Sequence, residues 1–212
     1  MQSPAPLLTA QGLCFGHSPA PLLFDRLALV LLPGVTWLGG DESSGKTTLL
    51  QLLAGALPAS AVRGQLHVRG VSLADNRASY RQQVSWLDPR DTALDARTAR
   101  EIFAALPEQH LGCGLDALQA HIAGLSLAPH LDKALGILST GTRRKVLLAA
   151  ALAAHATVTL LDQPFKALDR PSIDYLLAVL RQASGQQARA CVVADYEAPP
   201  GVALAGTVAL RA

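Results

Sequence analysis

A glycine-rich stretch near the start of the chain has the residue types and the spacing of a phosphate-binding loop. Residues 40–48 read Gly-Asp-Glu-Ser-Ser-Gly-Lys-Thr-Thr and fit the pattern G-x-x-x-x-G-K-[ST]. Glycines let backbone N–H groups turn inward around an anion, and a following helix adds its partial positive charge. Lys46 can then reach the outer phosphates, and the Thr47 hydroxyl can bind Mg²⁺. The stretch therefore predicts a site for Mg²⁺ and a nucleoside triphosphate.

The residues on either side of this loop supply the elements that it requires. Residues 35–38 form a short apolar run that predicts a buried strand, and residues 47–55, which end in glycine, predict a helix. The order strand, loop, helix sets the loop at a helix N-terminus, where anions bind. Every loop residue is consequently a candidate nucleotide ligand: Gly40, Asp41, Glu42, Ser43, Ser44, Gly45, Lys46, Thr47 and Thr48.

A carboxylate at the end of a later apolar run is the second candidate. Residues 157–162 read Thr-Val-Thr-Leu-Leu-Asp, so Asp162 ends a strand that we expect beside the strand before the loop. A carboxylate there, together with Thr47, suits Mg²⁺ and its waters. Taken alone, an apolar run that ends in Asp is more often a plain strand end. The metal assignment therefore depends on the phosphate loop.

Strands and helices alternate along most of the chain. Apolar runs bounded by turn residues predict strands near 7–10, 13–15, 27–31, 64–71, 84–87 and 188–194. Helical spacing predicts helices at 143–154 and 172–182, and the Ala- and Leu-rich residues 91–138 predict a small helical subdomain. The alternation predicts an α/β fold with a mainly parallel core sheet, and the early strands predict an antiparallel part at its edge.

The composition excludes several classes of protein. The 212 residues are 50% apolar and 16% charged, which suits one globular domain with a large core. A net charge of +2 with scattered arginines predicts no nucleic-acid partner. The three cysteines are far apart and lack metal-ligand spacing, so neither a disulfide framework nor a zinc site is expected. The longest mostly apolar run, 146–161, is too short to predict a membrane span.

The motif that follows the helical region makes the chain resemble a known family. Residues 138–145 read Leu-Ser-Thr-Gly-Thr-Arg-Arg-Lys and resemble the signature L-S-x-G of ABC-type ATPases, which precedes a basic helix. The order of the other motifs agrees, because residues 40–47 are similar to the family's Walker A, 158–162 to its Walker B and 166–169 to its D-loop. The resemblance implies a P-loop NTPase fold of the ABC type that binds ATP and Mg²⁺.

The resemblance also implies an organisation and partners. Residues 1–212 would form a single ATP-binding domain, with a nucleotide-binding core at 1–88 and 145–212 and a helical subdomain at 89–144 that carries the signature loop. In the family, two such subunits hold ATP between them. Ser139 and Gly141 are therefore expected to contact the nucleotide of a second ABC ATPase subunit, in a homodimer or heterodimer.

A membrane-spanning transporter subunit is the other implied partner, which would place the chain at the cytoplasmic, inner face of the cell membrane. Within the family, the short length and the run from Asp162 are most similar to the small haem-exporter ATPase of cytochrome c maturation.

Three positions that serve hydrolysis in the family are changed. Gln163 stands where the family has a glutamate, and it can orient a water but cannot take its proton, a loss of about 10²–10⁴-fold. Asp88 stands where the Q-loop glutamine is expected, and it can reach Mg²⁺ through a water. Tyr196, or Asp195 before it, occupies the place of the switch histidine. Gln163, Asp88 and Tyr196 are therefore the candidate catalytic residues.

Further departures concern nucleotide binding. Asp41 and Glu42 put two acids near a polyanion, so either they point to solvent or nucleotide affinity is reduced. The aromatic residue that stacks on adenine in the family falls near Phe15 or His17, and the spacing fits His17 better. A core Phe15 with a solvent-exposed His17 is an equal alternative.

Three functions remain open from the sequence. The first is an ATP-binding transporter subunit with weakened hydrolysis, and the second is a non-hydrolysing ATP clamp paired with a catalytic subunit. A soluble ABC protein outside transport is disfavoured, because the long coiled-coil insertions or twin cassettes of such proteins do not fit in 212 residues.

Overall fold

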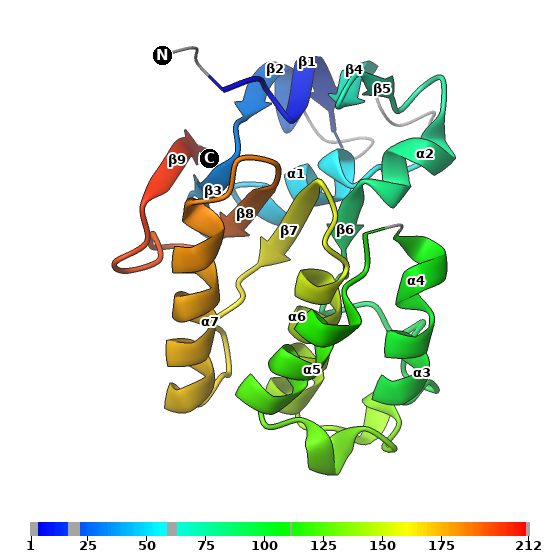
Figure 1. Ribbon diagram of the computed structural model, residues 1–212. Helices are drawn as coiled ribbons and strands as arrows, with labels where there is room; N and C mark the ends of the chain where they lie inside the picture. The colour runs from blue at the N-terminus through cyan, green and yellow to red at the C-terminus, as the bar shows by residue number, and fades with distance from the viewer. Residues whose placement is uncertain (1–3, 17–21, 59–62, 111, 211–212) are drawn as a thin grey trace.

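Two β-sheets and a set of helices make up the computed structural model, which describes residues 4–16, 22–58, 63–110 and 112–210 (Figure 1). One sheet is antiparallel with the strand order β2-β1-β4-β5: β1 (Leu8–Phe15), β2 (Phe24–Leu31), β4 (Arg63–Val68) and β5 (Val71–Ser72). The other is parallel with the order β6-β7-β8-β3-β9: β3 (Gly34–Gly39), β6 (Val84–Trp86), β7 (Val158–Asp162), β8 (Ala190–Ala194) and β9 (Leu204–Ala209). The predicted α/β fold with a parallel core sheet and an antiparallel part is confirmed.

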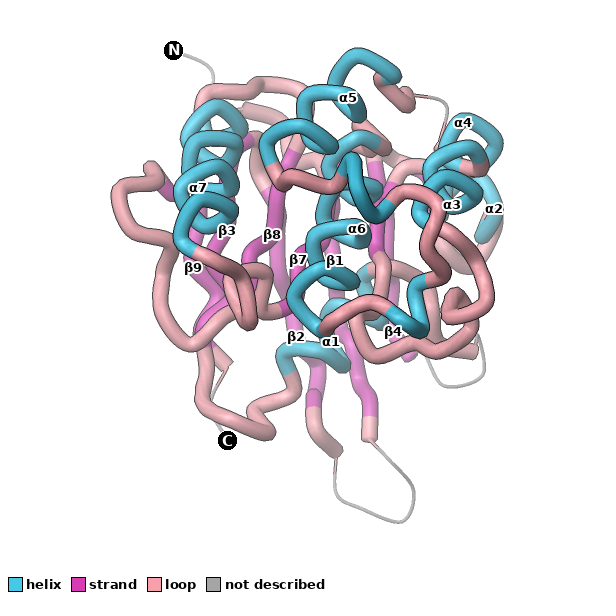
Figure 2. Tube along the Cα trace, turned by 90° about the horizontal axis from the view of Figure 1, so that it is seen from below, coloured by secondary structure: helices cyan, strands magenta, loops and turns pink. Residues whose placement is uncertain are grey.

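The helices lie between the two sheets and on the outer face of the parallel sheet. α1 (Lys46–Leu53) lies between the sheets, where its leucines join the strands in one hydrophobic cluster. Figure 2 shows the later helices over the other face of the parallel sheet. The remaining helices are α2 (Arg77–Gln82), α3 (Ala99–Ala104), α4 (Leu106–Gln109), α5 (Leu115–Gly124), α6 (Thr140–Ala153) and α7 (Arg170–Ser184), with 3-10 turns η2 (Ala128–His130) and η3 (Leu135–Ile137).

The core strands are apolar on both faces because both faces are covered. Neighbouring residues of a strand point to opposite sides of the sheet. On β7, Leu160 joins the cluster with α1, whereas Leu161 joins the cluster formed with α3, α5, α6 and α7. Val192 and Val193 divide in the same way on β8. Such continuous apolar runs are typical of parallel sheets buried on two sides.

The structure refines the predicted elements at several points. The two runs expected at 7–10 and 13–15 lie in one strand, β1, whose pairing shifts around Gly12, a residue with φ of +63°. Residues 64–71 divide into β4 and β5, which pair across the turn at Arg69 and Gly70. Helix α2 and strand β9 were not predicted. Within the described ranges, no helix is both long enough and apolar enough to cross a bilayer.

The predicted helical subdomain, 89–144, contains helices α3 to α5 and the start of α6. Its apolar residues are not a separate core, because Ile102, Leu118 and Leu135 belong to the same cluster as Leu161 and Leu176 of the remaining fold. The division into two subdomains stays a prediction.

Candidate nucleotide-binding site

The predicted phosphate loop joins β3 to α1, and its conformation requires glycine at the start of the helix. Gly45 is the residue before α1 and has φ of +90°, in the region that disfavours residues with a Cβ. A Cβ there would also lie 2.9 Å from Cδ2 of Leu23 and 3.0 Å from Cζ of Phe24. The loop therefore turns into the helix with its backbone close to the end of the antiparallel sheet.

Lys46 is a buried cation held by uncharged groups. Its side chain belongs to a residue that is only 6% exposed, and its ammonium donates to the carbonyl oxygens of Gly40 (2.6 Å) and Asp41 (2.7 Å). The ammonium also lies 4.5 Å from the centre of the Tyr196 ring. Among the described residues, Lys46 forms no ion pair. An anion that enters here would be the first full negative charge in contact with this ammonium.

The loop forms one wall of a cavity of about 510 Å³. This volume lies within the usual range of small-molecule sites. Other walls come from the ends of β7 and β8 and from helix α6. The lining residues besides Glu42 to Thr48 are Leu23, Pro89, Arg90, Arg144, Asp162, Gln163, Lys166 and Tyr196.

Thr47 and Asp162 meet at the base of this cavity, as predicted for a metal site. The Thr47 hydroxyl donates to Oδ2 of Asp162 at 2.6 Å, although the two residues are far apart in the sequence. The expectation that β7 lies beside β3 is wrong, because β8 lies between them. All three strands are parallel, so the carboxyl end of β7 still reaches the loop. A hydroxyl beside a carboxylate is the oxygen ligand pair that Mg²⁺ prefers, so these residues fit the ion.

Gln163 follows Asp162, and hydrogen bonds to both its N–H and its carbonyl hold its backbone. Its φ is +43°, its N–H donates to the carbonyl of Ala194 (2.8 Å), and its own carbonyl accepts from Nη1 of Arg144 (2.5 Å). The same Nη1 donates to the carbonyl of Asp162 (3.0 Å). The Gln163 side chain, which lines the cavity, therefore projects from a rigid support.

Arg144 is a site residue that the sequence did not reveal. It is 9% exposed, lines the cavity, and its Nε has no hydrogen-bond partner within the described chain. Burial lowers the pKa of its guanidinium, while the carboxylates of Asp162 and Asp195 oppose that shift. The basic run after the signature was visible in the sequence, but nothing in it indicates which residue turns inward.

The predicted switch position places Tyr196 at the cavity and Asp195 behind it. Tyr196 is 48% exposed and lines the cavity, with its ring against Lys46. Burial, together with the charge of Asp162, raises the pKa of the Asp195 carboxyl, whose Oδ1 accepts the backbone N–H of Tyr196 (2.8 Å). The lining of the cavity does not include Asp195.

The other predicted residues include one beside the cavity and two in the loop itself. The Asp88 carboxylate accepts from Nε2 of Gln51 (3.3 Å) and from the backbone N–H of Arg90 (2.9 Å), and Asp88 does not line the cavity. Asp41 and Glu42 of the loop are exposed, and Glu42 lines the cavity. His17 lies outside the described residues. The catalytic and nucleotide-stacking roles suggested for Asp88 and His17 stay predictions.

Ser139 and Gly141 are not part of this cavity. Ser139 is exposed and caps α6, since its Oγ accepts the backbone N–H of Thr142 (3.2 Å). Gly141 packs against the chain after β7 so closely that a Cβ would lie 2.4 Å from the carbonyl oxygen of Ala167. The signature loop therefore lies outside the lining of the cavity that the phosphate loop forms.

The fold and the site define a P-loop nucleotide-binding protein, with a glycine loop, a buried lysine and a threonine–aspartate pair at the end of a parallel sheet. Residues 30–166 match the ABC transporter family. The chain belongs to this family, and it is an ATP-binding subunit of an ABC transporter.

Relatives by sequence include cytochrome c biogenesis ATP-binding export proteins CcmA. The protein from Pseudomonas putida is 33% identical over 160 residues, which cover 75% of either chain. The one from Nitrosococcus oceani is 35% identical over 182 residues, covering 84% of this chain and 80% of the relative.

Two solved structures share the fold. The ATP-binding subunit of an ABC transporter has a TM-score of 0.77 at 20% identity, covering 90% of this chain and 79% of that chain. A putative ABC transporter ATP-binding protein from Pyrococcus furiosus has a TM-score of 0.72 at 20% identity, covering 96% of both chains.

Proposed function

We propose that the chain holds Mg-ATP in the cavity beside Lys46 and that a second ABC ATPase subunit completes the site. The observation that carries this proposal is the buried Lys46 ammonium, which contacts carbonyl groups and an aromatic ring but forms no ion pair within the described residues. ATP phosphates are the anions that the surrounding loop geometry suits. Because Ser139 and Gly141 lie outside this cavity, they are available to the nucleotide of another subunit.

The residues of the cavity divide the work of binding. Lys46 would exchange its bonds to Gly40 and Asp41 for bonds to phosphate oxygens, and the N-terminus of α1 would add backbone donors. Thr47 and Asp162 would hold Mg²⁺, which neutralises phosphate charge when it is bound.

Hydrolysis in this chain's own cavity would be weak, because Gln163 can orient a water but cannot accept its proton. Asp162 accepts from Thr47 and would bind the metal, and Asp195 does not line the cavity. Glu42 also lines the cavity, as an exposed residue of the phosphate loop. The glutamine at the position of the family's glutamate favours the second candidate function, a subunit that clamps ATP while a catalytic partner hydrolyses it.

The transport role would be export linked to cytochrome c biogenesis, with a haem-type cargo. Support comes from the CcmA relatives, which match across 75–84% of this chain. The membrane-spanning part would come from a separate transporter subunit, and the chain would lie on the cytoplasmic, inner face of the membrane. ABC ATP-binding subunits in general act as dimers on such membrane partners.

Binding of a non-hydrolysable ATP analogue with Mg²⁺, measured by titration calorimetry, tests the proposal. Lys46→Ala removes a charge-assisted contact of about 1.5–3 kcal/mol, so affinity should fall about ten- to a hundred-fold. The matched control is Lys133→Ala, which removes an exposed lysine that does not line the cavity. Unchanged affinity in Lys46→Ala would refute the site.

A further inference from the structure

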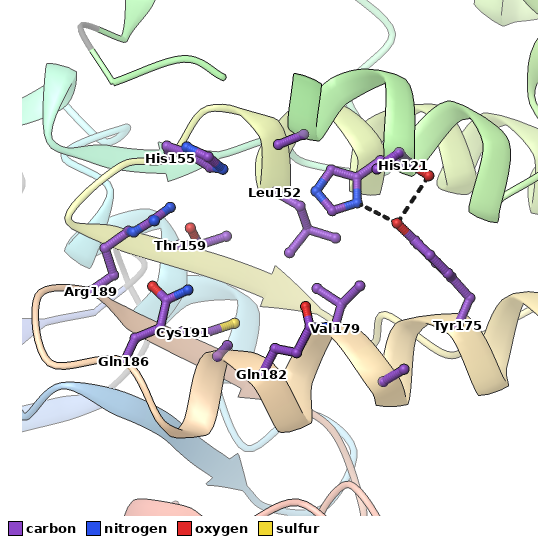
Figure 3. Close-up of a pocket in the computed structure, with 14 residues that line it drawn as sticks. His121, Leu152, His155, Thr159, Tyr175, Val179, Gln182, Gln186, Arg189 and Cys191 are labelled. Carbon is purple, nitrogen blue, oxygen red and sulfur yellow. Dashed lines mark hydrogen bonds between the residues drawn. The ribbon is translucent and has the colours of Figure 1, made fainter. Parts of the chain in front are cut away.

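A second cavity, of about 460 Å³, lies away from the phosphate loop, between helices α5 and α7 (Figure 3). Its floor is the parallel sheet, from which Thr159 of β7 and Cys191 of β8 point toward the helices. Ala120 and Ala178 are exposed on its rim, so the cavity opens to solvent between the two helices. Its size suits a small molecule.

One end of this cavity is cationic and lacks a counter-charge. Arg189 and His155 line this end, and they also line an adjoining cavity of about 270 Å³ together with Arg69. Among the described residues, Arg189 forms no ion pair, and no Asp or Glu lines either cavity. A half-buried guanidinium without a carboxylate partner favours an anionic ligand group.

The middle of the cavity is apolar. Its walls include Leu152 of α6, Val179 of α7 and several alanines of α5 and α7, while Gln182 and Gln186 line the cavity on the α7 side. These side chains offer contact area but no hydrogen bonds, so they suit the hydrocarbon or aromatic body of a ligand.

The far end offers a hydrogen-bond acceptor. The Tyr175 hydroxyl donates to the carbonyl of Ala120 (3.1 Å), so Nδ1 of His121 must donate to the Tyr175 oxygen (2.8 Å). Burial lowers the pKa of His121 to about 4, which leaves the ring neutral with its one proton on Nδ1. Nε2 is then an acceptor, and Figure 3 shows the ring between Tyr175 and the His155 side of the cavity.

We propose that this cavity binds a small organic carboxylate whose apolar body lies between α5 and α7. The carboxylate contacts Arg189, and a donor at the opposite end of the molecule contacts His121. The site is separate from the ATP cavity, because it lies toward the start of β7 and β8, whereas Asp162 and Tyr196 follow their ends.

Titration calorimetry without nucleotide tests whether the carboxylate of the ligand contributes to binding. The probes are 3-(4-hydroxyphenyl)propanoate and the alcohol of the same body, 4-(3-hydroxypropyl)phenol. The acid should bind at least about tenfold more tightly than the alcohol. Arg189→Gln should weaken the acid about ten- to a hundred-fold and leave the alcohol unchanged, whereas Arg63→Gln, at an exposed position on β4, should change neither.

A third probe, 3-phenylpropanoate, lacks the hydroxyl and tests whether a ligand donor contacts His121. It should bind several-fold more weakly than its hydroxylated analogue, and His121→Phe should remove that difference. Ala120→Phe, at the exposed rim, should block all three probes while circular dichroism stays unchanged. The proposal is overturned if neither acid binds at millimolar concentration, if the acid and the alcohol bind equally, or if Arg189→Gln has no effect on the acid.

Discussion

Tyr196 packs its ring on the Lys46 ammonium, the group expected to bind the outer phosphates. Such a cation–π contact is worth about 0.5–2 kcal/mol. A phosphate that approaches Lys46 must share this ammonium with the ring or displace it. We therefore expect the residue at the switch position to affect nucleotide binding directly, in addition to any part in hydrolysis.

Restoring the family's hydrolytic residues should raise turnover. Gln163→Glu supplies a proton acceptor and Tyr196→His supplies the switch histidine, so the double variant should release phosphate faster than the wild type by up to about 10²–10⁴-fold. Steady-state phosphate release by the purified chain is the measurement. Brisk turnover by the unmodified chain that Gln163→Ala abolishes would show instead that glutamine suffices.

Stability should fall in mild acid because of His121. Burial, and the charge of His155, lower its folded-state pKa from 6.5 to about 4, so the unfolded chain takes up the proton first as the pH falls. The stability due to the neutral ring is complete above pH 6.5 and is lost as the pH falls toward 4. Urea unfolding across this pH range should show a smaller fall in the free energy of unfolding for His121→Phe than for the wild type. Parallel curves for the two proteins would contradict the assignment.

At the scale of elements, helix α6, which follows the signature loop, contacts the segment after β7 through an ion pair and a close backbone approach. Lys145 of α6 forms an ion pair with Asp169 (2.7 Å), and Asp169 in turn caps α7 by accepting the N–H of Ser172 (3.0 Å). The hydrogen bond from Lys145 is the main cause of the low pKa of the Asp169 carboxyl, which is about 2. Gly141 adds the close contact with the Ala167 carbonyl.

Gly141→Ala should destabilise the chain although alanine is the better helix former. Helix propensity alone predicts that the free energy of unfolding rises by up to about 1 kcal/mol. The added Cβ would meet the Ala167 carbonyl oxygen at 2.4 Å, and such overpacking costs about 1–3 kcal/mol. Urea unfolding gives the sign, with the exposed Thr140→Ala as the control. A more stable Gly141→Ala would show that the two segments separate easily.

The phosphate loop and the contact between Thr47 and Asp162 could be predicted from the sequence, because the loop and the end of β7 each depend on local order. Strand β3, the loop and α1 follow one another directly, and Asp162 ends an unmistakable apolar run. Arg144 could not be predicted, since three consecutive basic residues look alike until tertiary packing buries one. Strand β9 was missed because its pattern is weakly apolar, and its pairing with β3 is decided far away in the sequence.

At the scale of the molecule, Ser139 is exposed outside the cavity that the phosphate loop lines. In an assembled complex with a complete partner, Ser139→Arg should abolish hydrolysis, because bulk and charge would fill the expected γ-phosphate contact. Gln163→Ala should change it little, since the partner's residues would act on the other nucleotide. Phosphate release by the reconstituted complex is the measurement.

Ser139→Ala is the control for that experiment, because it removes the α6 cap, worth about 1 kcal/mol, without adding bulk. A complex that tolerates Ser139→Arg but loses hydrolysis in Gln163→Ala would show that this chain's own cavity hydrolyses ATP. A purely homodimeric assembly would rule out a catalytic partner with different residues.

Ser139, the residue expected to contact a neighbouring subunit's nucleotide, caps α6, and little more than one turn later the helix carries Arg144, which donates to the carbonyls of Asp162 and Gln163. So short a stretch of helix is stiff, so a displacement of Ser139 should also move the guanidinium that holds the backbone of Gln163. If both sites bind nucleotide as proposed, we expect the two contacts to be coupled. Binding or release of one nucleotide should then shift the residues around the other through this one helical segment.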